Sequence, residues 1–332
     1  MSAEYYDVNE RLPRHERAKT PPPMRLQPRD LEILVTIGYE YRYLTARQVH
    51  LLFFGGSMSQ TRLRLTKLYH NGYLDRVYRP VVKGSAEAIY CLDKRGADAL
   101  AAELDVDRDQ VFWQGRKKPL CQNSLEHALR VNDFRVGMSI ACAKTGTVSL
   151  AGKWIDEQLL READQRVKVP NPSDPDRHIE CPIVADGFFG LEFENGFCQF
   201  FMLEIDLGTE SNRRFALKVR AYRRYLDSGK YREVFDRETL KVLVVATSPR
   251  RTENLMRTAR EAGDKTMFWF TDFSQYMQDG ELMPEQLMSQ IWRVTGDWFT
   301  LGDEQRGSRY AQVAHLRENG MLRSLLELAG AD

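Results

Sequence analysis

The segment 197–205 constrains the fold more than any other part of the chain, because most of its residues are apolar. An apolar run of this length, bounded by turn residues, is typical of a central strand that is covered on both faces. Asn195-Gly196 precedes this run and is a strong hairpin signal, which pairs it with an apolar strand at 188–193. A third apolar run lies at 241–246. These runs predict a sheet buried between helices.

Helices are predicted around these strands, which makes the domain mixed α/β. A helix at 121–142 carries an apolar stripe, and a basic helix follows the capping segment Gly208-Thr209-Glu210-Ser211. A further helix at 253–262 precedes a fourth strand at 267–270. This order of elements implies a mixed sheet flanked by helices.

The sequence also predicts the structure of two other parts of the chain, the segment before the apolar strands and the C-terminal residues. The proline-rich segment 169–178 reads as an exposed loop, and residues 181–185 read as part of the first apolar strand. Residues 285–294 and the final LRSLLELAG read as helices. We therefore place the α/β domain at 121–280 and a helical extension at 281–332.

The first third of the chain predicts a smaller domain at residues 28–104. Thr45 is the expected cap of a second helix, and Ser57 or Ser59 caps a third helix. Three short helices, two strands of a hairpin and a closing helix form the order of a winged helix-turn-helix. The elements are expected at 28–41, 46–54, 57–71, 73–77, 88–92 and 94–104.

The third helix and the hairpin are locally basic. Across residues 57–83, six Lys and Arg residues accompany a single acid, Asp75, in a chain whose net charge is only +1. This is the charge pattern expected of a surface for double-stranded DNA, although a winged helix also serves protein contacts. The side chains expected to contact phosphates or base edges are Ser59, Gln60, Arg62, Arg64, Lys67, Arg76, Arg79 and Lys83.

Three other features bound the class of protein. Residues 1–27 read as a flexible basic and proline-rich tail, either disordered or an arm that touches DNA phosphates, and residues 105–120 read as a linker. No run of about 18 apolar residues is present, so no membrane span is expected. The five scattered cysteines form no CxxC pair, which argues against a zinc ribbon and for a reducing cytoplasm.

Carboxylates stand at the ends of the apolar runs, where a rigid backbone would hold them. Asp186 follows one run, and Glu204 and Asp206 close another. Mg²⁺ prefers a few carboxylates plus water and substrate oxygens, and such a cation promotes phosphodiester cleavage. We expect Asp186 and Glu204 to be metal ligands, with Glu126 as a further candidate. Asp206 and Lys218 are expected to belong to the same catalytic group.

The same residues also have structural interpretations. Asp186 reads equally well as a turn residue, and Glu204 and Asp206 share one face of a strand, where a basic helix can neutralise them. Residues 211–232 hold eight Lys and Arg residues and the single acid Asp227. That helix can also follow a DNA backbone through residues on one face, namely Arg213, Arg220 and Arg224.

The order of these motifs resembles a known fold. The order is Glu126 on a helix, Asp186, Glu204-Ile205-Asp206, and a helix with Lys218 and Tyr222. It resembles the restriction-endonuclease-like PD-(D/E)XK fold. More narrowly, a winged helix followed by LEID-GTE and a K-x-x-x-Y helix resembles the replication-relaxation family of plasmids, phages and integrative elements. The resemblance covers about residues 28–275 and implies a DNA-associated protein of a mobile element.

Two positions depart from the PD-(D/E)XK pattern. Asp206 stands where the pattern has its lysine, and Ala185 stands where the pattern has proline. Lys218 on the following helix is the candidate replacement, because some members of such folds relocate that lysine. The resemblance therefore implies the fold more strongly than the activity.

Two functional interpretations follow. In the first, the chain is a DNA-binding protein of a mobile element that acts in replication, relaxation or transfer. Its nuclease-like domain is then either an Mg²⁺-dependent endonuclease or an inactive relative that needs no cofactor. In the second, the chain is a transcriptional regulator whose C-terminal domain dimerises or senses a ligand. The expected partners are double-stranded DNA, a second copy of the chain, and a relaxase or replication proteins.

Overall fold

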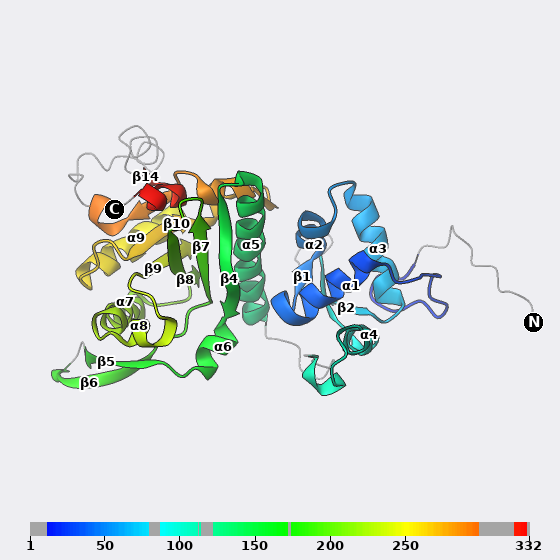
Figure 1. The fold of residues 1–332 in the computed structure, drawn as a ribbon, viewed down its shortest axis with the longest axis horizontal. Helices are drawn as coiled ribbons and strands as arrows, with labels where there is room; N and C mark the ends of the chain where they lie inside the picture. Colours follow the sequence, from blue (N-terminus) through cyan, green and yellow to red (C-terminus); the bar gives the residue numbers. More distant parts are fainter. Residues whose placement is uncertain are drawn as a thin grey trace, which may run out of the picture. The chain divides into compact units, whose positions relative to one another are not determined.

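A computed structural model describes residues 12–79, 87–111, 113, 122–171, 174–298 and 322–330 (Figure 1). The chain divides into two compact units, Met1–Val136 and Gly137–Asp332. The division falls inside the helix α5 (Gln122–Thr145), so each unit contains part of that helix. Each unit contains both helices and strands, and the fold is mixed α/β, as the sequence predicts. None of the helices in these residues is both long and apolar enough to cross a membrane.

The first unit combines short helices with an antiparallel sheet of order β1-β3-β2. Thr45 caps α2 and Ser57 caps α3, as predicted, and the pairing of β2 with β3 confirms the predicted hairpin. The elements are α1 (Pro28–Val35), the π-helix η1 (Thr36–Tyr41), β1 (Leu44–Thr45), α2 (Ala46–Phe53), α3 (Met58–His70), β2 (Leu74–Tyr78), β3 (Ala88–Leu92), α4 (Lys94–Leu104) and the 3-10 helix η2 (Arg108–Gln110).

The N-terminal residues that the structure describes lie along the first unit. Arg17 donates hydrogen bonds to the carbonyl oxygens of Tyr69 (3.0 Å) and Leu74 (3.1 Å), and it forms an ion pair with Asp93. One guanidinium therefore joins the end of α3, the start of β2 and the cap of α4. Residues 1–11 lie outside the described residues.

The second unit is built on a seven-stranded sheet of order β14-β13-β10-β9-β8-β7-β4. Strands β8, β9 and β10 run parallel, and the other neighbours pair antiparallel. The predicted central strand is confirmed, since Phe201 and Leu203 of β8 are fully buried. The elements are β4 (Val148–Asp156), α6 (Glu157–Glu162), β7 (Gly187–Phe193), β8 (Cys198–Asp206), α7 (Asn212–Asp227), α8 (Lys230–Phe235), β9 (Lys241–Ala246), α9 (Pro249–Glu261) and β10 (Phe268–Asp272).

Helices α7 and α9 cover one face of this sheet (Figure 1). Phe215 and Val219 of α7 and Leu255 of α9 share a buried apolar cluster with Val242 and Val244 of β9. Phe215 and Val219 are four residues apart, which places both on the inner face of the helix. The carboxyl ends of the parallel strands therefore lie next to the first turns of two helices.

The segment predicted as an exposed loop, 169–178, is instead part of a β-hairpin. Strands β5 (Arg166–Asn171) and β6 (Asp174–Pro182) pair antiparallel. The alternation in β5 explains the difference, because Val167 and Val169 are buried and their neighbours along the strand are exposed. The prolines of the segment suggested a loop, but the cross-strand pairing outweighs them.

Within the described residues, the predicted helix at 285–294 is wrong, and the predicted final helix is a short strand followed by a 3-10 helix. Residues 285–294 form a 3-10 helix and then a strand, because Trp292 pairs across the sheet with Arg323. Residues 299–321 lie outside the described part of the chain. The elements after β10 are η3 (Phe273–Gln275), β11 (Met277–Gln278), β12 (Glu281–Leu282), η4 (Pro284–Met288), β13 (Trp292–Val294), α10 (Thr295–Trp298), β14 (Leu322–Arg323) and η6 (Leu325–Gly330).

Candidate functional site

Glu204 and Asp206 lie at the carboxyl end of β8, on the face that α7 and α9 cover. They are two residues apart in a strand, so their side chains point to the same side of the sheet. Only 5% of Glu204 and 7% of Asp206 is exposed. A buried carboxylate is costly unless it is paired, and each of these two has a different cationic partner.

Two residues of α7 hold Glu204. Lys218 Nζ lies 2.8 Å from Oε2, and the Tyr222 hydroxyl donates a hydrogen bond to Oε1 at 2.5 Å. Lys218 and Tyr222 are four residues apart and therefore share one face of the helix. The structure thus brings Lys218 into contact with Glu204.

Asp186 lies beside Glu204 because β7 and β8 are antiparallel. The strand expected at 181–185 is not continuous with β7, which begins one residue after Asp186 and pairs there with Leu203. The Asp186 amide donates to the carbonyl oxygen of Leu203 at 2.9 Å, and its Oδ2 accepts from the amide of Ile205 at 2.6 Å. The start of β7 therefore fixes Asp186 against the backbone on both sides of Glu204.

Glu210 is a third carboxylate at this place, and the prediction from sequence missed it. Its Oε2 lies 3.4 Å from Lys218 Nζ. The available signal was the GTE that follows LEID, since a short loop must return Glu210 to the end of β8. We call Asp186, Glu204, Glu210, Lys218 and Tyr222 the Glu204 cluster. Three carboxylates around one ammonium give this cluster an excess of negative charge.

The pKa values of Glu204, Lys218 and Tyr222 all lie above their usual values. Burial raises the pKa of Glu204 to about 7, because Lys218 offsets the loss of solvation only in part and Asp186 adds repulsion. Burial lowers the pKa of Lys218, but Glu204 and Glu210 outweigh burial and leave that pKa above its usual value. Burial and the Glu204 charge raise the pKa of Tyr222 well above its usual value. Lys218 therefore stays charged at neutral pH.

Asp186 and Glu204 are the residues of the Glu204 cluster that could hold a divalent cation. In proteins Mg²⁺ takes one or two carboxylates and fills its other positions with water and phosphate oxygens. Asp186 and Glu204 supply two neighbouring carboxylates whose charges repel each other. Within the described ranges, no group of three or more His, Cys, Asp or Glu side chains is placed to hold a metal, so such an ion would depend on this pair.

Asp206, predicted as part of the catalytic group, is held by Arg251. The Arg251 guanidinium donates to both Asp206 oxygens, at 2.8 and 2.7 Å. The same guanidinium donates to the Glu210 carbonyl oxygen at 2.5 Å and to Asn212 Oδ1 at 3.0 Å. This bidentate pair joins the end of β8 to the first turns of α7 and α9. Arg251 was not singled out from the sequence, because its partner is 45 residues away.

Glu126, predicted as a further metal ligand, belongs to a cluster of the first unit. Arg79 forms an ion pair with it, and Arg130 donates to its Oε1 at 3.1 Å. Arg130 also lies 3.4 Å from Asp133, which accepts from Gln48 at 2.7 Å. These contacts join the first half of α5 to the rest of the unit. They also engage Arg79, which was predicted to contact DNA.

The first turns of α3 carry exposed residues of the predicted DNA surface. Ser59, Gln60 and Arg62 are exposed. Arg64 is directed differently, because its Nε donates to the buried Asp30 at 2.6 Å. The predicted surface therefore separates into an exposed start of α3 and residues that pack the unit together.

Arg76 also takes part in packing. Its guanidinium lies 4.2 Å from the centroid of the Tyr69 ring and donates to Thr66 at 2.7 Å. Lys67 is half-buried, and Lys83 lies outside the described residues. The predicted DNA contacts of β2 and of the end of α3 are thus less available to a ligand than those at the start of α3.

The three arginines of α7 that were predicted to follow a DNA backbone lie at the surface of the second unit. Arg213 and Arg224 are exposed, and Arg220 is half-buried. Lys218 and Tyr222 of the same helix contact the buried Glu204. The inner side of α7 therefore contributes two residues to the Glu204 cluster, and its outer side carries arginines.

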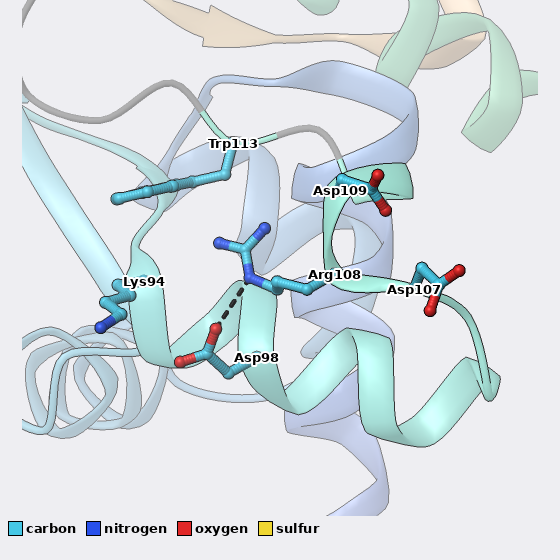
Figure 2. A pocket seen from close by; sticks show the side chains of 6 residues that line it. All are labelled: Lys94, Asp98, Asp107, Arg108, Asp109 and Trp113. Atoms are coloured by element: carbon cyan, nitrogen blue, oxygen red, sulfur yellow. Dashed lines mark hydrogen bonds and ion pairs between the residues drawn. The ribbon is translucent and has the colours of Figure 1, made fainter.

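A hollow of about 600 Å³ lies beside α4 in the first unit (Figure 2). Its central cation is engaged within the chain, because Arg108 donates to Asp98 at 2.7 Å and lies 5.2 Å from the centroid of the Trp113 ring. The hollow contains none of the residues predicted from the sequence. The residues that line it are Lys94, Asp98, Asp107, Arg108, Asp109 and Trp113.

Comparison with known proteins identifies the family. A search of curated proteins and a search of solved structures found no match. A family model described as replication-relaxation matches residues 36–237, which is more than half of the chain. The matched range contains α3 and every residue of the Glu204 cluster. The chain therefore belongs to the replication-relaxation family.

Proposed function

We propose that the chain binds double-stranded DNA and acts in the replication or relaxation of a mobile genetic element such as a plasmid. Membership of the replication-relaxation family suggests this role. The observation that carries the DNA-binding part of the proposal is the exposed start of α3, with Ser59, Gln60 and Arg62. Side chains of these types contact phosphates and base edges.

The packing behind α3 supports its use as a recognition helix. In helix-turn-helix proteins, the N-terminal residues of that helix contact base edges in the major groove. The first unit has the element order of a winged helix, with α3 followed by the β2–β3 hairpin. Arg64 and Arg76 behind the first turns are tied to Asp30 and Thr66. The helix is therefore held firmly while its N-terminal end stays exposed.

The affinity of the full chain for a labelled DNA duplex, measured by fluorescence anisotropy, tests this proposal. We expect Arg62→Ala to weaken binding by about 1–3 kcal/mol if Arg62 reads a base, or to lower the salt slope by about 1 if it binds a phosphate. Arg108→Ala is the matched control, since Arg108 lies in the same unit but pairs with Asp98. A wild-type protein that binds no duplex would contradict DNA binding. Equal affinities of the two variants for the duplex would show that the start of α3 does not contact the DNA.

The Glu204 cluster favours a second candidate function, which is DNA cleavage by a PD-(D/E)XK-like domain. Asp186 and Glu204 would hold a divalent cation, which when bound polarises the phosphate and lowers the pKa of a coordinated water. Lys218, at 2.8 Å from Glu204, would stabilise the negative charge that develops on the phosphate oxygens. Tyr222 keeps the Glu204 carboxylate oriented. Water would then attack phosphorus, and the departing sugar oxygen would leave with a proton.

Nicking of a supercoiled plasmid in Mg²⁺ or Mn²⁺ tests the second function. We expect Glu204→Gln and Lys218→Met to abolish nicking and to keep duplex affinity. Glu192→Gln is the control, because Glu192 is an exposed carboxylate of the neighbouring β7. A wild-type protein that binds DNA and does not nick it would mean that the nuclease-like domain is inactive, and the DNA-binding proposal would still hold.

A further inference from the structure

Helices α7 and α9 repeat the same arrangement of arginines. Counted from the first residue of each helix, arginine occupies the second, third, ninth and twelfth positions in both. The residues are Arg213, Arg214, Arg220 and Arg223 in α7, and Arg250, Arg251, Arg257 and Arg260 in α9. Together the two helices hold ten basic and three acidic residues, although the whole chain has a net charge of only +1.

The two helices run parallel and lie side by side at the same level. Each connects parallel strands of one sheet, from β8 to β9 and from β9 to β10, so both run in the same direction. At their starts, Arg251 of α9 donates to Asn212 of α7 at 3.0 Å. At their ends, Arg223 of α7 donates to the carbonyl oxygen of Ala262 at 3.4 Å. At the second position, Arg213 and Arg250 are both exposed, and at the ninth position Arg257 is exposed and Arg220 is half-buried.

Several of these arginines are not neutralised by the chain. Arg224, Arg250 and Arg257 are exposed, and Arg220 is half-buried. Within the described residues, Arg220, Arg224 and Arg250 form no ion pair, and Arg257 donates to the neutral Asn254 at 2.9 Å. Several other exposed arginines of this unit are paired with acids, as Arg232 is with Glu238 at 3.0 Å and Arg177 is with Asp174 at 3.4 Å.

We propose that the outer faces of α7 and α9 form one surface that binds the phosphate backbone of double-stranded DNA. We call this surface the arginine ladder, and it consists of Arg213, Arg220, Arg224, Arg250, Arg257 and Arg260. This surface rests on the proposed DNA-binding function and adds to it a second contact that does not depend on α3. The α9 half of the ladder is an addition to the α7 arginines expected from the sequence.

The geometry favours phosphate over base contacts. The ladder lies on the sides of two helices, with pairs seven residues apart, or about 10 Å along the helix axis. A guanidinium presents a planar fork that matches phosphate oxygens and loses little hydration energy. Contacts of this kind position DNA and do not depend on its sequence. The ladder is therefore expected to bind any duplex, with an affinity that falls steeply as salt increases.

The test uses the full chain and a labelled duplex of arbitrary sequence, titrated at several salt concentrations. Arg220→Gln/Arg257→Gln removes one pair of the ladder. We expect it to weaken binding on the order of tenfold and to lower the slope of log K against log salt by about 1.8. Arg177→Gln/Arg232→Gln is the control, because it removes the same charge from paired, exposed arginines of the same unit. A thermal melt checks that each variant is folded, and Arg213→Gln/Arg250→Gln provides a second, independent pair.

The possible results distinguish a failure of the arginine ladder from a failure of the proposed function. If both ladder variants bind the duplex as the control does while Arg62→Ala binds more weakly, the ladder is wrong and DNA binding by α3 stands. If the wild-type protein binds no duplex, the proposed function itself fails and the ladder fails with it. A ladder variant that loses affinity for a polyglutamate peptide and keeps its affinity for DNA would mark the surface as a docking site for an acidic protein, which also overturns the proposal.

Discussion

Two tyrosines of α7 show how strongly a single partner decides the role of a residue. Both Tyr222 and Tyr225 are buried on the inner side of the helix. The Tyr222 hydroxyl donates to Glu204, whereas the Tyr225 hydroxyl has no hydrogen-bond partner among the described residues. A buried acceptor that loses its donor keeps the full cost of desolvation, and a hydroxyl without a partner has no bond to lose.

Tyr222→Phe is therefore expected to destabilise the second unit by about 1–3 kcal/mol, because Glu204 Oε1 would stay buried without its donor. Tyr225→Phe makes the same chemical change on the same helix and should be neutral or slightly stabilising. Hydrogen exchange of β8 and α7, followed by mass spectrometry, measures the free energy of opening of this unit. Equal effects of the two substitutions would contradict the assigned role of Tyr222.

His70 links the stability of the first unit to pH. Its Nδ1 accepts a hydrogen bond from the Ala18 amide, so the ring is held in its neutral form. Burial lowers the pKa of His70 from 6.5 to about 4, and the nearby Arg76 and Arg17 add to the shift. A base whose pKa is lower in the folded state contributes stability that is complete above its unfolded pKa and is lost as pH falls towards its folded pKa.

The free energy of unfolding of the first unit should therefore decrease as pH falls from 6.5 towards 4. The contribution of this one group is at most about 1.4 kcal/mol per pH unit. His70→Asn keeps an acceptor near the Ala18 amide and removes the titrating group. Its free energy of unfolding should therefore depend less steeply on pH, by the uptake of one proton. Urea unfolding at a series of pH values measures this. Parallel profiles of the two proteins would show that His70 does not titrate in this range.

At the scale of elements, the segment before α1 behaves as part of the first unit. Asn71 donates to the Pro22 carbonyl oxygen at 2.9 Å, and Arg64 donates to the Arg25 carbonyl oxygen at 2.8 Å. Together with the bond from Arg17 to the Tyr69 carbonyl oxygen, these bonds lie along the second half of α3 and its C-cap. The segment therefore holds the back of the helix whose first turns are proposed to read DNA.

Arg17→Ala should loosen this segment. The change leaves two carbonyl oxygens and Asp93 without a shared donor, and we expect a loss of about 1–3 kcal/mol. Lys19→Ala is the control, because Lys19 is exposed in the same segment. Limited proteolysis of residues 12–27 provides the readout, with faster cleavage expected in Arg17→Ala alone. Equal cleavage rates would indicate that the backbone contacts suffice without Arg17.

Local signals made some elements predictable from the sequence, and long-range pairing decided the others. Thr45, Ser57 and Ser211 marked helix starts because a cap acts within three residues of its own position. The β5–β6 hairpin and strand β13 were missed because their pairing partners are distant or surrounded by prolines. Residue types and their order pointed to every member of the Glu204 cluster except Glu210, which required the path of a loop. Arg251, outside that cluster, required a neighbouring helix.

At the scale of the whole molecule, the chain is nearly neutral, but exposed basic residues gather on particular surfaces. Its net charge of +1 conceals an exposed basic start of α3 in one unit and the arginine ladder in the other. Two acidic residues of the second unit are neutralised in its interior, Glu204 by Lys218 and Asp206 by Arg251. Overall charge is therefore a poor guide to the partners of this protein.

If the two surfaces contact one duplex independently, their losses in binding free energy should add. Combining Arg62→Ala with Arg220→Gln/Arg257→Gln should weaken binding by the sum of the separate effects, within about 0.5 kcal/mol. Anisotropy titrations of the wild type and the three variants at one salt concentration complete the cycle. A combined variant that binds as well as one of its parents would mean that the two surfaces do not engage the same DNA.

The position of the unit boundary inside α5 determines how the protein can be divided into fragments. A fragment that ended at Val136 would stop in the middle of the helix and leave the last four carbonyl groups without their intrahelical donors. A fragment of the first unit should therefore extend to Thr145, and a fragment of the second should start at Gln122. Each fragment then carries its own copy of α5, and a single cut cannot yield two intact halves.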